Sequence, residues 1–255
     1  MNKRKKVGKN NPPMSLAALS LAVLLLLSMP RILLAGESPQ GTWGGKMEFS
    51  LLTAQGNSST QTGSLKAKAA RETKKDKWIA RTGGLLSNSD GAKTAEYYYL
   101  NGEYNYHHSE LTYSSYFLGW QKDTLAGLNT RLTGRVGLGH TCFKKELDSL
   151  VTEAGLAVVY ENKKNEASNT FPEGRLFGKY GHTFREGVIF TQEVEGLQDL
   201  TMLTKYRINS LSALEVRLNN HWAVKVSLTV QYDHDPAEGF LKTDTFTETS
   251  FVYQF

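Results

Sequence analysis

An alternation of apolar and polar residues runs through most of this chain and predicts β-strands. In the clearest segment, residues 222–233 (WAVKVSLTVQYD), the even positions carry Trp, Val, Val, Leu, Val and Tyr, while most odd positions are polar. Successive side chains of a strand point to opposite faces, so such a segment has one apolar and one polar face. No long stretch has the i, i+3, i+4, i+7 spacing of an amphipathic helix. The pattern therefore predicts an all-β fold.

The alternating segments number about twelve. An even number of antiparallel strands suits a closed up-and-down transmembrane β-barrel with both termini at one end. The tenth segment is the least regular, because Leu211 and Ala213 interrupt its alternation. The predicted strands span residues 42–53, 60–71, 77–86, 93–106, 111–121, 128–141, 149–161, 173–183, 187–196, 202–218, 222–233 and 242–255.

The connecting segments predict a barrel with short turns at one end and longer loops at the other. Segments after the even strands are short, such as FREG and HHSE, whereas those after the odd strands include SNSDGAKT and DHDPAEGF. The longest predicted loop covers residues 162–174. We expect the longer loops to be extracellular, and we hypothesise that the 162–174 loop folds into the barrel mouth.

The last nine residues, TETSFVYQF, place Phe251, Tyr253 and Phe255 on one face of a final strand. An exposed aromatic edge invites aggregation in a soluble domain, whereas barrel closure within a membrane removes the edge. This ending resembles that of bacterial outer-membrane barrels. The resemblance implies that these three residues signal to the barrel-assembly machinery, and that the chain's location is the bacterial outer membrane, with its lipid as a partner.

Residues 1–35 have the order of a secretory signal peptide. Five basic residues fall within the first nine positions, an apolar run covers residues 15–27, and the small residues Ala35 and Gly36 follow. The run is short for a transmembrane helix, and Arg31 would lie in lipid. We expect cleavage after Ala35, leaving residues 36–255 as the barrel domain. A retained anchor and a start at Met14 are the alternatives.

The basic character of the chain belongs to this leader. Residues 1–35 hold 6 of the 30 basic residues and none of the 25 acids, so the remainder carries 24 − 25 = −1. The balance gives no reason to expect a nucleic-acid partner. Cys142 is the single cysteine, which excludes an internal disulfide. No motif calls for a cofactor.

Aromatic residues cluster near the predicted strand ends, as amphipathic rings do at a lipid interface. A soluble β-sandwich or a lipocalin-like calyx, in which such rings pack a core, is the alternative, but it explains neither terminus. The predicted interface rings are Trp43, Trp78, Tyr106, Tyr113, Trp222 and Phe255 at the short-turn end, and Trp120, Tyr160 and Tyr232 at the other.

The polar faces would line the barrel lumen, and they carry both charge signs in comparable number. Arg131 and Arg135 either form a basic ladder facing an anionic solute or, as we expect, pair with Glu153 and its neighbours. Twelve strands lie between filled eight-stranded and open sixteen-stranded barrels, so strand number does not decide whether the lumen is open. The candidate lumen-facing residues are Arg131, Arg135, Glu153, Lys225 and Glu248.

Catalytic and metal sites find little support. A lipid-modifying barrel enzyme would need a Ser–His pair on the lipid face, and neither His140 nor His182 has a placeable Ser beside it. His107 and His108 fall in a turn. The acids of DHDPAEGFLKTD, Asp233, Asp235 and Glu238, could hold a divalent cation, but they fit a solvated loop better. We expect no enzyme activity and no bound metal.

That loop also carries a family resemblance. Residues 232–245 followed by 251–255 resemble the C-terminal signature of the salt-induced outer-membrane protein family, and Trp43–Leu51 with Gly56–Ser58 is similar to its first strand and turn. The resemblance implies an outer-membrane barrel with expression linked to salt, and supplies no catalytic residues. Two functions stay open: a narrow solute channel, which we favour slightly, or a non-conducting structural or interaction barrel, distinguished by whether the lumen charges pair with one another.

Overall fold

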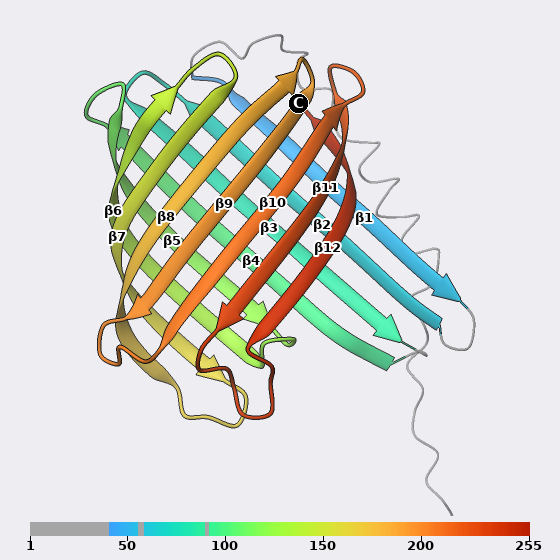
Figure 1. Ribbon diagram of the computed structural model, residues 1–255. Coiled ribbons are helices and arrows are strands. Elements are labelled where there is room, and N and C mark those ends of the chain that lie inside the picture. The colour runs from blue at the N-terminus through green and yellow to red at the C-terminus, as the bar shows by residue number, and fades with distance from the viewer. Residues whose placement is uncertain (1–40, 56–58, 90–91) are drawn as a thin grey trace, which may run out of the picture. The chain divides into compact units, whose positions relative to one another are not determined.

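The structure, a computed structural model, describes residues 41–55, 59–89 and 92–255, so the predicted signal segment 1–35 lies outside the described residues. Within these described residues, no helix is both long enough and apolar enough to cross a membrane. Twelve strands account for most of it (Figure 1): β1 (Trp43–Gln55), β2 (Ser59–Glu72), β3 (Asp76–Ser89), β4 (Ala92–His107), β5 (Thr112–Asp123), β6 (Leu128–Lys144), β7 (Asp148–Lys163), β8 (Asn169–Arg185), β9 (Val188–Asp199), β10 (Tyr206–Arg217), β11 (Trp222–Asp233) and β12 (Thr243–Gln254).

These strands form one closed antiparallel barrel. Each strand pairs with its neighbours in sequence, and β1 pairs with β12 to close the ring. The predicted all-β, twelve-stranded, up-and-down barrel is therefore confirmed. One end of the barrel, here called the turn end, holds the C-terminus and the connections 73–75, 108–111, 145–147, 186–187 and 218–221. The other end, here called the loop end, holds the connections 124–127, 164–168, 200–205 and 234–242.

The predicted long loop at 162–174 is wrong. Only residues 164–168 connect β7 to β8, because β8 already begins at Asn169. Phe171 turns into the barrel and is buried with Ala157 and Val159, which draws Pro172 and its neighbours into the sheet. Similarly, β10 begins at Tyr206 and not at 202, because the Asp199 carboxylate accepts hydrogen bonds from the Thr201 and Met202 amides and holds a turn there.

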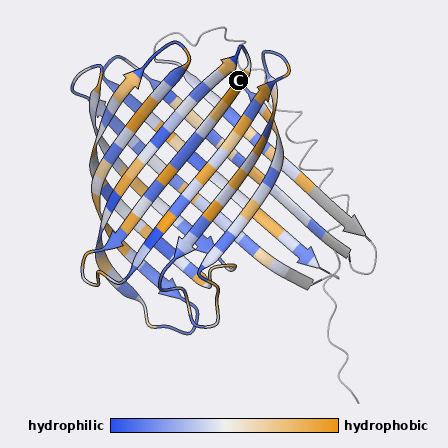
Figure 2. Cartoon of the chain, in the orientation of Figure 1, coloured by the Kyte–Doolittle hydropathy of each residue, from blue (hydrophilic) through white to orange (hydrophobic). Residues whose placement is uncertain are grey.

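Apolar side chains cover the outside of the barrel and polar ones line its inside. Leu118, Leu138 and Leu176 are 72%, 66% and 69% exposed on the outer face. Figure 2 shows the result as alternating orange and blue bands along the strands, with mostly blue connections. This arrangement is the reverse of that in a soluble barrel, and it suits a wall with lipid outside and water inside.

The closing contact between β1 and β12, here called the seam, is short. Register pairs join only Lys46–Phe49 of β1 to Phe251–Gln254 of β12, and Gly45 and Phe255 exchange two further backbone hydrogen bonds of 2.7 and 3.0 Å. By contrast, β1 pairs with β2 along its whole length. In Figure 1 the blue β1 and red β12 run apart beyond the seam. Among the described strands, the seam is therefore the boundary with the fewest backbone pairs.

Side chains reinforce the seam on both faces. Outside, the Phe49 ring stacks on Phe251 at 5.7 Å and meets the edge of Trp222 at 6.2 Å. Inside, three Lys–Glu ion pairs reach from β1 and β2 across to β10, β11 and β12. These pairs are Lys46–Glu215 (2.9 Å), Lys225–Glu48 (2.6 Å) and Lys66–Glu248.

Removing one of these carboxylates should weaken closure. We expect Glu248→Gln to lower the free energy of unfolding by roughly 1–3 kcal/mol, because Lys66 would keep its charge in the wall without an anionic partner. The measurement is a urea titration in lipid vesicles followed by tryptophan fluorescence. Glu146→Gln, in the exposed 145–147 turn, is the matched control, and equal midpoints for the two variants would contradict the role given to Glu248.

Candidate functional site: the barrel lumen

The lumen contains a cavity of about 2020 Å³. Side chains from all twelve strands line it, and it reaches from the 73–75 and 108–111 turns at one end to Pro236, Leu241 and Lys242 at the other. A cavity needs only about 10–15 Å³ of such space to hold one water molecule. The lumen is therefore large and polar, and its lining extends from the turn end to the loop end.

The structure places all five candidate lumen residues in this lining: Arg131, Arg135, Glu153, Lys225 and Glu248. Lys225 and Glu248 take part in the seam ion pairs described above. Glu153 belongs to a cluster at mid-height, whereas Arg131 lies nearer the loop end. Arg131, Arg135 and Glu153 each have a partner on an adjacent strand.

Arg175 of β8 organises the cluster at mid-height. Its guanidinium donates to Glu153 of β7 at 2.6 Å and to Glu195 of β9 at 2.5 Å. The Tyr113 hydroxyl donates to Glu153 at 2.6 Å, and Asn209 donates to Glu195 at 3.0 Å. Tyr113 was expected at the lipid interface. That prediction is wrong, because its register position points it into the lumen, where its hydroxyl finds a carboxylate.

Arg131 and Arg135 do not share Glu153 as expected. Arg131 lies directly across from Glu161 and forms its ion pair with it. Arg135 instead lies over the Phe117 ring, 4.2 Å from its centroid. Arg131 thus pairs with another carboxylate of β7, whereas the expected contact with Glu153 itself is wrong, because Arg175 takes this carboxylate from the adjacent strand.

The 234–242 loop folds over the loop end of the lumen. Ala237 is 1% exposed, and a Cβ on Gly127 of the β5–β6 turn would come within 2.8 Å of it and 2.7 Å of Phe240. Lys163 of β7 donates to the Asp235 carbonyl at 2.5 Å. Since β6 and β11 lie five strands apart in the ring, the loop crosses the mouth. The 234–242 loop therefore occupies the barrel mouth, into which the 162–174 segment was expected to fold.

An ion pair outside the strands holds the loop. Lys205 of the 200–205 connection lies 2.6 Å from the Asp235 carboxylate. The hydrogen bond from Lys205 lowers the pKa of Asp235 below its ordinary value of 3.8, and the same bond raises the pKa of Lys205 above 10.5. Asp233, in turn, lies 3.8 Å from Lys163. Two of the three acids considered as cation ligands, Asp233 and Asp235, thus face lysines, and among the described residues no group of three His, Cys, Asp or Glu is arranged to hold a metal ion.

One serine–histidine contact was missed in the sequence. His108 Nε2 lies 2.7 Å from Ser114 Oγ across the 108–111 turn, whereas His182 contacts Asp148 at 2.8 Å. Within the described chain, no carboxylate hydrogen-bonds His108, and Ser114 sits in the sheet opposite Tyr106 and Leu138. The pair thus lacks the orienting acid of a triad.

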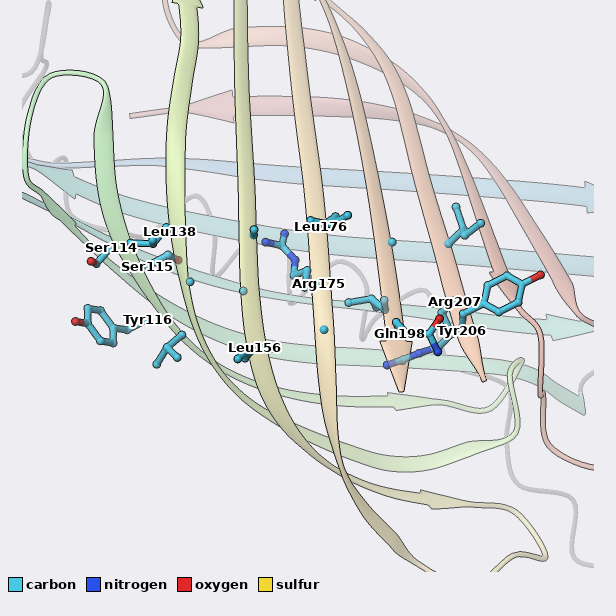
Figure 3. A pocket seen from close by; sticks show the side chains of 18 residues that line it. Ser114, Ser115, Tyr116, Leu138, Leu156, Arg175, Leu176, Gln198, Tyr206 and Arg207 are labelled. Carbon is cyan, nitrogen blue, oxygen red and sulfur yellow. The ribbon is translucent and has the colours of Figure 1, made fainter. Parts of the chain in front are cut away.

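Ser114 borders a groove of about 850 Å³ on the barrel wall. Figure 3 shows the groove spread over neighbouring strands, with Tyr116, Leu138, Leu156 and Leu176 contributed by β5, β6, β7 and β8. These leucines are outward and largely exposed. The groove is part of the apolar exterior.

A closed antiparallel barrel with an apolar exterior and an ion-paired lumen is the fold of bacterial outer-membrane β-barrels. The COG4313 outer membrane channel from Pseudomonas putida F1 is similar, with a TM-score of 0.52 and 11% identity over 88% of this chain and 100% of that one. The translocator domain of the autotransporter NalP from Neisseria meningitidis has a TM-score of 0.48 and 13% identity over 94% and 96% of the two chains.

The family is established by sequence. Residues 47–255 match the model described as "Protein of unknown function, DUF481", and the chain belongs to that family. It is also 28% identical over 170 residues to the uncharacterized protein YdiY of Escherichia coli (strain K12), covering 66% of this chain and 65% of that protein. The match thus spans slightly less than two thirds of that relative. The name of a salt-induced family stays a prediction.

The Asp235–Lys205 pair predicts how the loop responds to pH. A carboxyl whose pKa is lowered in the folded protein stabilises it above the ordinary pKa, and this contribution is lost as the pH falls through the lowered value. The loop should therefore be held at neutral pH and loosen below about pH 3.8. Asp235→Asn should loosen it at pH 7, measured as spin-label mobility at position 238. Glu110→Gln in the 108–111 turn is the control; equal mobility in Asp235→Asn and the wild type would contradict this role.

Proposed function

We propose that this barrel is a narrow channel for small polar solutes across the bacterial outer membrane. The observation that carries the proposal is the cavity whose lining runs from the turn residues 73–75 to the loop residues Pro236 and Leu241. We place the turn end in the periplasm and the loop end outside, as in bacterial barrels with short periplasmic turns. The outward apolar belt and the aromatic C-terminal strand support this placement.

The ion pairs are compatible with passage because they run along the wall. Arg175 on β8 binds carboxylates of the adjacent β7 and β9, and Arg131 on β6 binds Glu161 of the adjacent β7. The widest pair between described strands, Lys163–Asp233 at the loop end, spans four strands of the ring from β7 to β11, and the others span three strands or fewer. Pairing therefore cancels much of the wall charge while leaving the axis to water.

The loop at the outer mouth would set the size limit. Residues 234–242 cross the mouth, and the Lys163 and Asp233 side chains approach each other beneath them from β7 and β11. A mouth narrowed in this way admits small solutes and excludes large ones. The link to salt or osmotic stress rests on the sequence resemblance alone.

A non-conducting structural barrel is the second candidate. Its support is the extent of pairing in the lumen, since paired charges satisfy one another without a solute, together with the loop across the mouth. We propose no enzymatic role, because the His108–Ser114 contact lacks an orienting carboxylate among the described residues. The large cavity is the reason for preferring the channel.

Liposome swelling tests the channel and its size limit. We expect vesicles containing the folded protein to swell with a pentose, more slowly with a disaccharide, and hardly with a trisaccharide. Replacing residues 236–240 by two glycines should speed entry of the trisaccharide, because it removes the part of the loop that packs on Gly127.

The control for this deletion is Leu203→Ser, which changes an exposed residue of the neighbouring 200–205 connection. Vesicles containing this variant should swell as those containing the wild type do. If the folded wild type and the loop deletion both exclude even the pentose, the channel is contradicted and the structural barrel is favoured.

A further inference from the structure

Three basic residues lie side by side in one row of the lumen wall. Lys68 of β2 is directly opposite Lys46 of β1 on one side and Arg81 of β3 on the other. The row continues with the uncharged Gln254 of β12 and Asn101 of β4. Like charges directly opposite one another destabilise a sheet, so this row needs a compensating negative charge.

The two outer members of the row have that charge within the protein. Lys46 lies 2.9 Å from Glu215, and Arg81 lies 2.8 Å from Glu103. Lys68, between them, forms no ion pair with any described acid. Its ammonium is the unmatched cation of the row.

Nearby carboxylates are already engaged by other bases. Glu48, one row away on β1, pairs with Lys225 at 2.6 Å, and Glu248 pairs with Lys66. The charged groups that act most strongly on Lys68 are all basic: Arg81, Lys179, Lys77 and Lys46. Of these, Lys179 and Lys77 also have their own acids, Glu193 and Glu72.

Lys68 is accessible from the cavity. Lys68 is exposed, and it lines the lumen together with Lys46, Arg81 and Lys179. A solute in the lumen can therefore reach the ammonium without any rearrangement of the wall. A lysine ammonium offers three hydrogen-bond donors and a compact charge.

We propose that Lys68 binds the anionic group of a small solute, a carboxylate or a phosphate, and that the Lys46–Lys68–Arg81 row makes the lumen favour anions. The bound anion supplies the negative charge that the row lacks. The selectivity rests on the proposed channel function, whereas the binding does not, since it needs only access from one end.

Binding is tested by NMR on the full-length protein in detergent micelles, with the lysines reductively methylated using ¹³C. This modification preserves the positive charge. The Lys68 signal, identified by its loss in Lys68→Gln, should shift saturably with inorganic phosphate and less with KCl of the same ionic strength. Lys145, in the exposed 145–147 turn outside the cavity lining, is the reference and should show no saturable shift. A linear, unsaturable response of Lys68 equal to that of Lys145 would overturn the site.

Selectivity is tested by the reversal potential of planar bilayers in a KCl gradient. We expect the wild type to favour Cl⁻, Lys68→Gln to lose part of this preference, and Lys68→Arg and Lys145→Gln to retain it. An unchanged reversal potential in Lys68→Gln overturns the selectivity. A folded barrel that carries no current overturns the channel, while the phosphate titration still decides the binding site.

Discussion

Closure of the sheet between its first and last strands is the constraint on which the barrel depends. In lipid, an unpaired backbone N–H or C=O group costs several kcal/mol, so a spanning sheet must return to its first strand. Here β1 and β12 share four register pairs and the Gly45–Phe255 bonds. The stacked rings of Phe49 and Phe251 outside and the Lys–Glu pairs inside add contacts where backbone pairing is short.

The ion pairs near the seam differ from those on the opposite wall in the residues they use and in the number of strands they span. Around the seam, lysines pair with glutamates two or three strands away, and a flexible lysine side chain suits that reach. On the opposite wall, arginines bind carboxylates mainly on adjacent strands, where a planar fork with several donors can join two acids, as Arg175 joins Glu153 and Glu195. The unmatched Lys68 lies on β2, next to the seam, where the lysine-rich row begins.

Much of the fold could be predicted from the sequence, because alternation is a local property. It gave the twelve strands and the inward direction of Arg131 and Glu248. The C-terminal face of Phe251 and Phe255 also follows from it, and both rings are more than half exposed on the outside; their role in assembly stays a prediction. The prediction of a loop around Pro172 was wrong. The loop-forming residues there are visible in the sequence, whereas the burial of Phe171 against another strand is not.

The charge partners could not be predicted, because they depend on register and side-chain reach between strands. Arg131 meets Glu161 and Glu153 meets Arg175 only once the strands are aligned. Tyr113 was assigned to the lipid interface because it lies near a strand end. Its place in the inward–outward alternation of β5 instead directs its side chain into the lumen. The His108–Ser114 contact requires the 108–111 turn to be built first. The loop across the mouth likewise depends on packing against Gly127, more than a hundred residues earlier in the chain.

The central claim is that a water-filled path runs through the barrel, inside a wall whose charges are largely paired. Single-channel conductance in planar bilayers tests this claim most directly. Protein that is shown to be folded should give small, discrete and reproducible current steps in KCl. Absence of steps from protein that is shown to be inserted and folded would contradict an open lumen, and would mean that the paired charges and the 234–242 loop close it.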